Sequence, residues 1–193
     1  MIDLSVFGIP KITGVLHLGS NSGQELEYYK WMGINTRIWV DPFHEVAGER
    51  CLPYAVGSHK PHLYIASNNG ESSSFLKPKM HVAKYPHITF KQVETWRLKW
   101  TKVTTIIALH VPTEVNLMVL DLQGMELEAL RTCSKFYFNV FDYIVTEAYT
   151  EELYEGNGYL HEIEEYLKDH YKLVKFIPEA DKGWGYAYFE RIK

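Results

Sequence analysis

The first forty residues alternate between strand-like and helix-like patterns in an order that few folds accommodate. Residues 15–18 form an apolar run that ends in a glycine-containing turn. Leu26, Tyr29 and Gly33 then recur three and four residues apart, which predicts an amphipathic helix that ends at Gly33. A second strand-like run follows at residues 37–40. Strand, turn, helix and strand in this order predict a βαβ unit and hence a parallel sheet.

The rest of the chain extends this pattern and then departs from it. Residues 117–120 are apolar throughout, as expected of a strand that is covered on both faces. Further strands are predicted at residues 52–56, 62–66, 88–93, 143–145, 172–177 and 186–191, and helices at 126–134 and 160–167. The last two strands are joined by a short turn, so they must be antiparallel. We therefore expect one α/β domain over residues 1–193, with a mostly parallel central sheet, a C-terminal antiparallel hairpin and helices on both faces.

Composition limits the class of protein and its partners. The 193 residues carry a formal net charge of −4, which provides no positive field for a nucleic acid or an anionic membrane. No apolar run approaches the ~20 residues that span a bilayer, and the N-terminus lacks the pattern of a signal peptide. Cys51 and Cys133, the only cysteines, fit a reducing compartment better than a disulfide framework. We expect a cytoplasmic protein.

Three carboxylates directly follow apolar runs: Asp41, Asp121 and Glu147. Ligands of open parallel sheets bind outside the carboxyl ends of the strands, so these acids are expected to share one crevice with the turn at residues 19–23. Asp41 lies 22 residues after Gly19, near the ~20-residue offset at which an acid contacts ribose hydroxyls. The turn lacks the third glycine of the Gly-x-Gly-x-x-Gly motif that binds dinucleotides. No Gly-x-x-x-x-Gly-Lys-Ser/Thr phosphate-binding loop is present either. The pattern favours a nucleoside without phosphates, with its ribose on Asp41 and a small charged tail at the turn.

Two stretches resemble motifs of a known enzyme family. Residues 15–25, Val-Leu-His-Leu-Gly-Ser-Asn-Ser-Gly-Gln-Glu, are similar to the first motif of S-adenosylmethionine-dependent methyltransferases. Residues 120–130, Leu-Asp-Leu-Gln-Gly-Met-Glu-Leu-Glu-Ala-Leu, resemble the more specific signature of the FkbM family of methyltransferases. Three further segments fit this family in order, namely residues 71–76, 146–156 and 186–189. The chain departs from the family pattern at Asp41, at Met125 and above all at His17. In the family, an acid is usual at the position of His17.

The resemblance implies a Rossmann-like class I methyltransferase fold and methyl transfer from S-adenosylmethionine to a hydroxyl, often of a sugar. The residues that we expect to bind this cofactor are Gly19, Asn21, Gly23, Gln24, Asp41, Ser74 and Asp121. An alcohol is a poor nucleophile until it loses a proton, so a base or a metal should stand beside the methyl group. Asp121 is the first candidate for this place and Glu147 the second. Either acts as the base, or the two share a divalent cation.

Two other functions stay open on the residues alone. One is a nicotinamide-dependent oxidoreductase, although the missing third glycine argues against it. The other is a non-catalytic Rossmann-like domain that binds a nucleoside. None of the nine histidines belongs to a His-Glu-x-x-His motif, so no zinc site is predicted.

The acceptor, a small molecule or a glycan, is expected to be bound by one of three parts of the molecule. These are residues 68–86, residues 150–158, or a second subunit of a possible homodimer. Lys77, Lys79 and Lys84 form a local basic cluster. We interpret this cluster as a solvated face, with contact to an anionic acceptor as the alternative.

Overall fold

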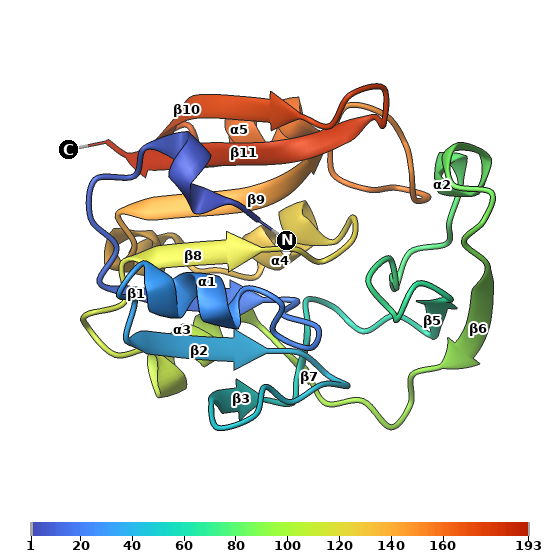
Figure 1. The fold of residues 1–193 in the computed structure, drawn as a ribbon, viewed down its shortest axis with the longest axis horizontal. Coiled ribbons are helices and arrows are strands. Elements are labelled where there is room, and N and C mark those ends of the chain that lie inside the picture. Colours follow the sequence, from blue (N-terminus) through green and yellow to red (C-terminus); the bar gives the residue numbers. More distant parts are fainter. Residues whose placement is uncertain (1, 193) are drawn as a thin grey trace.

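The computed structural model describes residues 2–192, and its centre is a seven-stranded sheet (Figure 1). The strands lie in the order β10 (Tyr171–Pro178), β11 (Trp184–Arg191), β9 (Tyr143–Tyr149), β8 (Leu117–Leu120), β1 (Gly14–Leu18), β2 (Thr36–Val40) and β3 (Arg50–Leu52). β11 is antiparallel to both of its neighbours, and the pairings among the other strands are parallel. The predicted mostly parallel sheet with a C-terminal antiparallel hairpin is therefore confirmed.

Helices cover both faces of the sheet, but unequally (Figure 1). One face packs against α3 (Val103–His110), α4 (Glu126–Arg131) and α5 (Leu160–Leu167). The other face packs against α1 (Leu26–Trp31) and the short 3₁₀ helix η1 (Leu4–Phe7), and a second 3₁₀ helix, η2 (Lys135–Val140), precedes β9. Met118 and Leu120 of β8 belong to the first core and Leu117 and Val119 to the second. This alternation explains why every residue of β8 is apolar.

The segment between β3 and α3 lies beyond the carboxyl ends of the parallel strands (Figure 1). It contains two small sheets, in which β4 (Ala55–Val56) pairs with β7 (Trp100–Thr101) and β5 (His62–Ala66) pairs with β6 (Phe90–Glu94), together with helix α2 (Met80–Lys84). We call residues 57–102 the arm. Among residues 2–192, no helix is long and apolar enough to cross a bilayer.

The arm region is also where the sequence prediction differs most from the structure. The single strand predicted at residues 52–56 is wrong: Leu52 ends β3 and Ala55 begins β4, and the two strands pair with different partners. Pro53 lies between them and has no N–H to donate to a continuing ladder. The β6 strand begins two residues later than the expected position 88. Helices α2 and α3 were not anticipated by the pattern.

Candidate active site

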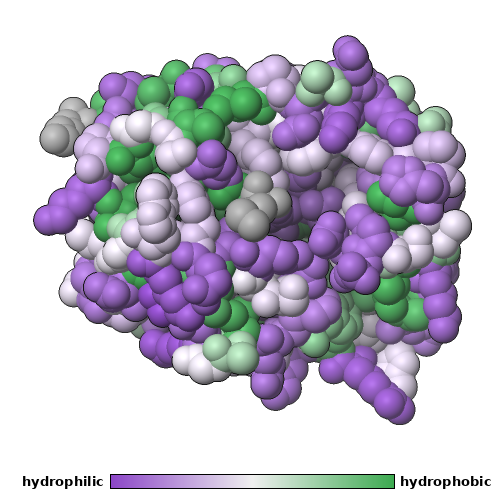
Figure 2. All heavy atoms as spheres, viewed as in Figure 1, coloured by the Kyte–Doolittle hydropathy of each residue, from purple (hydrophilic) through white to green (hydrophobic). Residues whose placement is uncertain are grey.

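A cavity of about 1060 Å³ opens between the carboxyl ends of the parallel strands and the arm. Figure 2 shows the hollow on this face, bordered largely by hydrophilic residues. Its walls come from three parts of the chain: the loops after β1, β2 and β8, the arm, and the paired strands β9 and β11. The three carboxylates Asp41, Asp121 and Glu147 all line this one cavity, as their positions after strands suggested.

Most of the residues that we expected to bind a cofactor lie in the cavity wall. These are Gly19, Asn21, Gln24, Asp41 and Asp121. Gly23 and Ser74 lie outside the lining and support it from behind. Gly23 has φ +76°, and a Cβ there would lie 2.5 Å from a methyl group of Val46. Ser74 Oγ donates to the carbonyl of Gln123 at 2.6 Å, so this serine ties the arm to the loop after β8. Direct contact of either residue with a ligand stays a prediction.

The turn after β1 passes unusually close to the end of β8. Gly19 has φ +81°, and a Cβ at this position would lie 1.9 Å from the backbone oxygen of Asp121. Only glycine permits this approach. Beyond it, Ser20 Oγ and Asn21 Oδ1 are buried and have no hydrogen-bond partner among the described residues. Buried polar atoms without partners cost free energy, so the turn is suited to a polar ligand.

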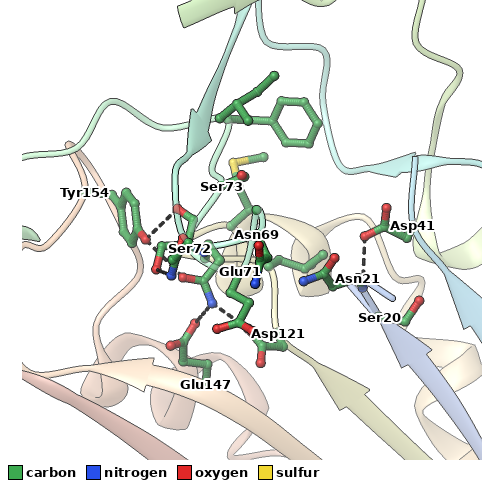
Figure 3. Close-up of a pocket in the computed structure, with 18 of the residues that line it drawn as sticks. Ser20, Asn21, Asp41, Asn69, Glu71, Ser72, Ser73, Asp121, Glu147 and Tyr154 are labelled. Carbon is green, nitrogen blue, oxygen red and sulfur yellow. Dashed lines mark hydrogen bonds between the residues drawn. The ribbon is translucent and has the colours of Figure 1, made fainter. Parts of the chain in front are cut away.

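Asp41 connects the ends of β1 and β2 (Figure 3). Its Oδ1 accepts the backbone N–H groups of Phe43 at 2.8 Å and His44 at 2.9 Å, and lies 3.0 Å from His44 Nδ1. Its Oδ2 accepts the N–H of Asn21 at 3.1 Å and has no second donor among the described residues. A carboxylate oxygen has two lone pairs, so Oδ2 keeps the capacity to accept a ligand hydroxyl.

Asp121 and Glu147 are joined by a neighbouring amide (Figure 3). Gln123 Nε2 donates to Asp121 Oδ1 at 2.6 Å and to Glu147 Oε2 at 3.0 Å. The hydroxyl of Tyr149 also donates to Glu147 Oε2, at 2.6 Å. Burial raises the pKa of Asp121 to about 6. Burial and the nearby charge of Asp121 raise the pKa of Glu147 well above its ordinary value. Groups with such pKa values in a cleft are candidates for acid–base chemistry.

A third acid in this region, Glu126, serves the loop. Its carboxylate accepts the backbone N–H groups of Leu122 at 2.7 Å and Gly124 at 3.0 Å, and the side chain is fully buried. Burial raises the pKa of Glu126, while these N–H groups oppose the rise by stabilising its ionised form. Glu126 thus fixes the loop that carries Gln123.

His17 and Glu25 line the part of the cavity behind the glycine turn. His17 stacks on Trp39 with ring centroids 5.5 Å apart, and Tyr29 OH lies 3.2 Å from its Nδ1. Burial lowers the pKa of His17, which keeps the ring uncharged at neutral pH. Glu25 is 5% exposed, and its carboxylate accepts a long hydrogen bond of 3.3 Å from Ile2 N. Glu25 thus supplies a buried acid near the position where the family pattern would have one.

The basic cluster predicted at the arm is neutralised by acids. Lys77 pairs with Glu155 at 2.9 Å, Lys84 pairs with Glu151 at 2.7 Å, and Lys79 pairs with Glu152. These ion pairs connect the arm to the loop after β9, so the lysines do not form a free anion-binding patch. No three His, Cys, Asp or Glu side chains within residues 2–192 are grouped as a metal site requires.

Sequence reasoning missed several residues of the cavity wall. Gln123 lies inside the motif at residues 120–130, and Tyr149 follows Glu147 by two residues, which places both on one face of β9. The motif and the two-residue spacing could in principle have identified Gln123 and Tyr149 from the sequence. Tyr154, Tyr85 and Trp184 come from separate parts of the chain, and no local pattern indicates that they meet.

Comparison with known proteins connects this geometry to a family. The family model of the methyltransferase FkbM domain matches residues 17–174. A comparison with curated proteins finds no match. The matched range runs from β1 into β10 and includes all three carboxylates at strand ends together with the arm. Because the match covers most of the chain, the protein belongs to the FkbM family of methyltransferases.

Proposed function

We propose that the protein is an S-adenosylmethionine-dependent O-methyltransferase that acts on a hydroxyl group of a sugar or glycan. The observation that carries this proposal is the convergence of Asp41, Asp121 and Glu147 on one cavity beside the turn at Gly19. Carboxylates favour a cationic ligand, and the sulfonium of this methyl donor is a cation. A nicotinamide dinucleotide would bring two phosphates to the same acidic site.

The cavity wall provides partners for each part of the methyl donor. Asp41 Oδ2 has a free lone pair for a ribose hydroxyl. Ser20 and Asn21 contribute buried polar atoms that have no partner among the described residues, and these suit the methionine end. Glu25 adds a carboxylate that can pair with the amino group of that end.

Asp121 is the proposed general base. When bound, S-adenosylmethionine supplies the methyl group: the carbon–sulfur bond breaks with its electron pair left on sulfur, a carbon–oxygen bond forms, and the hydroxyl proton departs. Asp121 can receive this proton, because burial raises its pKa to about 6 and its Oδ2 accepts no hydrogen bond from the described residues. Beyond this, the chain contributes mainly by holding the reacting groups in position.

The far end of the cavity suits an uncharged ring with hydroxyl groups. Trp184 Nε1 donates to Tyr85 OH at 2.8 Å, and the rings of His81 and Tyr85 lie 4.7 Å apart. Burial lowers the pKa of His81 to about 4, so this wall is neutral at physiological pH. Lys182 lies at the rim and pairs with Glu179 at 3.5 Å. Aromatic faces combined with polar edges support a saccharide as the acceptor.

The proposal also includes the compartment. Cys51 and Cys133 are both free thiols, which supports a reducing environment such as the cytoplasm.

Calorimetry and methyl transfer test the proposal together. We expect S-adenosylmethionine and S-adenosylhomocysteine to bind, and labelled methyl groups to be transferred to a member of a panel of sugars, nucleotide sugars and glycans. Asp121→Asn should lower turnover about 10²- to 10⁴-fold, because the general base is lost, and change the affinity for S-adenosylhomocysteine only a few-fold. Asp169→Asn is the control, since Asp169 is exposed and pairs only with Lys135 among the described residues. Heat with NAD and none with either sulfur compound would favour an oxidoreductase, and full turnover by Asp121→Asn would remove Asp121 from the mechanism.

A further inference from the structure

The side chain of Gln123 lies between the two acids at the centre of the cavity. Its backbone has φ +51°, in the left-handed region, which directs the side chain from the loop after β8 back toward β9. Non-glycine residues adopt this conformation at some cost, and such sites are often functional. Gln123 is therefore held in a costly conformation in which one amide reaches both carboxylates.

The orientation of the Gln123 amide is fixed from both sides. Its Nε2 carries two hydrogens, and the structure has one carboxylate oxygen for each, at 2.6 Å and 3.0 Å. Its Oε1 faces the hydroxyl of Tyr154 at 3.0 Å, and this hydroxyl also lies 3.1 Å from the carbonyl of Ser72. Rotating the amide by half a turn would place an oxygen against two carboxylates. The arrangement with Nε2 toward Asp121 and Glu147 gives each carboxyl group a donor.

Two buried carboxyl groups that share an amide titrate as a pair. Burial raises the pKa of both carboxyl groups, and the charge of Asp121 raises the pKa of Glu147 further. Two buried carboxyl groups so close together do not both ionise readily, so a pair that holds one proton is favoured at neutral pH. The other titratable groups around the pair are Tyr29, Tyr149, Tyr154, Tyr186, Glu25 and Glu126. The four tyrosines have raised pKa values and stay neutral, so they add no charge near pH 7.

We propose that Gln123 is a positioning residue that joins Asp121 and Glu147 into a pair with one proton and one negative charge, which makes the cavity prefer a cationic donor to its uncharged product. This inference rests on the proposed function, because it concerns the same methyl donor. Asp121 receives a single N–H and keeps Oδ2 for the reacting hydroxyl, whereas Glu147 Oε2 accepts from both Gln123 and Tyr149. Asp121 is thus the member of the pair that has an oxygen free for the reacting hydroxyl.

The charge of the pair also matters in the transfer step. S-adenosylmethionine has a permanent positive charge on sulfur, and S-adenosylhomocysteine has none. When the base takes the hydroxyl proton, the pair becomes neutral in the same step in which the sulfur loses its charge. The site and its ligand therefore change charge together, and neither is left with an unbalanced charge in a buried cavity.

Affinity ratios test the inference without knowledge of the acceptor. We would measure the affinities of S-adenosylmethionine and S-adenosylhomocysteine by calorimetry at a series of pH values on both sides of neutrality. The ratio of the two affinities should rise about tenfold as the pair gains its charge with rising pH. In Gln123→Met, which removes both donors, the midpoint of this rise should move up by about one pH unit, because carboxylates without hydrogen bonds ionise less readily.

Two further variants separate positioning from folding. Asp169→Asn removes an exposed carboxylate that pairs only with Lys135 among the described residues, so the midpoint should not move. Tyr154→Phe removes the hydroxyl that faces Gln123 Oε1, so it should move the midpoint in the same direction as Gln123→Met but less far. It also serves as the test if Gln123→Met does not fold.

The outcomes distinguish failure of the role of Gln123 from failure of the proposed function. Binding with a ratio that does not change with pH, or an unmoved midpoint in both Gln123→Met and Tyr154→Phe, would overturn the role of Gln123 and leave the methyl donor in place. Failure of both sulfur compounds to bind the wild-type protein would instead refute the proposed function, and this inference with it.

Discussion

Glu147 is a buried carboxyl group whose ionisation opposes folding. In the unfolded chain it ionises near its ordinary pKa, whereas burial and the charge of Asp121 raise its pKa in the folded protein. Between these two values the folded state binds more protons than the unfolded state. The free energy of unfolding therefore falls as the pH rises through this window, and Asp121 contributes with the same sign between its ordinary pKa and about 6.

Replacement of this group by its neutral analogue should stabilise the protein at high pH. Glu147→Gln keeps an oxygen that accepts from Tyr149 and resembles the protonated acid. We expect the melting temperature to rise by several degrees at pH 8, corresponding to about 1–2 kcal/mol, and to change little at pH 4. Circular dichroism melts at the two pH values would measure this. Asp169→Asn, on the surface, should have no effect at either pH, and equal destabilisation by Glu147→Gln at both would contradict the linkage.

At the scale of single residues, the sequence identified the acids better than their partners. Asp41 and Asp121 could be placed because each directly follows an apolar strand, and parallel strands end at the same edge. Glu147 was expected after a strand that ends at residue 145, whereas β9 continues to Tyr149 and Glu147 lies near its carboxyl end. The contact between Gln123 and Tyr154 depends on a left-handed backbone and on two segments 31 residues apart. Neither feature leaves a periodic pattern in the sequence.

At the scale of elements, the close approach of the β1 turn and the end of β8 holds the cavity together. Gly19 and Gly33 both have left-handed backbones, with φ +81° and +73°. A Cβ at Gly33 would meet no atom within 4 Å, whereas a Cβ at Gly19 would meet the Asp121 carbonyl. A side chain at either position would therefore force an unfavourable left-handed backbone, but only a side chain at position 19 would also clash with a neighbouring strand.

This pair of glycines gives a matched test of the approach. Gly33→Ala should lower the free energy of unfolding by about 1 kcal/mol, the cost of a left-handed backbone alone. Gly19→Ala should cost several kcal/mol more, because β1 and β8 must separate to admit the methyl group. Urea unfolding measures both. Equal effects of the two variants would mean that the turn and β8 separate without resistance.

The sequence predicts a strand well where both of its faces are buried. It predicts secondary structure poorly where contacts between distant parts of the chain determine it. The run at residues 117–120 coincides with β8, because a strand that is buried on both faces is a continuous apolar stretch. The run at residues 62–66 also coincides with β5, although only Leu63 and Ala66 of that strand are buried. Helix α3 begins Val-Thr-Thr-Ile-Ile, five β-branched residues that favour strands by propensity. It is nonetheless helical, since Val103, Ile106 and Ile107 pack on the sheet.

At the scale of the whole molecule, a large sheet faces a small arm across the cavity. The arm contains the two-stranded sheet of β5 and β6, strand β7 and a five-residue helix, and such elements have little stability of their own. Many of its links to the rest of the protein are polar. They include the Lys84–Glu151 ion pair at 2.7 Å and the hydrogen bond between Trp184 and Tyr85 at 2.8 Å. We therefore expect the arm to open independently of the sheet.

Amide hydrogen exchange would reveal this difference. Amides of β5 and β6 should exchange from states at least about 2 kcal/mol lower in free energy than those that expose β8. Trp184→Phe, which removes the hydrogen bond to Tyr85, should speed exchange in the arm and leave β8 unchanged. Trp31→Phe is the control, because Trp31 is 77% exposed. Equal protection of the arm and the sheet would argue for one cooperative unit.

The arm is a single contiguous stretch of chain, whereas the carboxylates of the cavity come from three separate strand ends. A recombination event that exchanged residues 57–102 would renew one wall of the cavity and leave Asp41, Asp121 and Glu147 where they are. Such an exchange would change the wall that we propose for the acceptor and would not move the acids that we propose for the methyl donor.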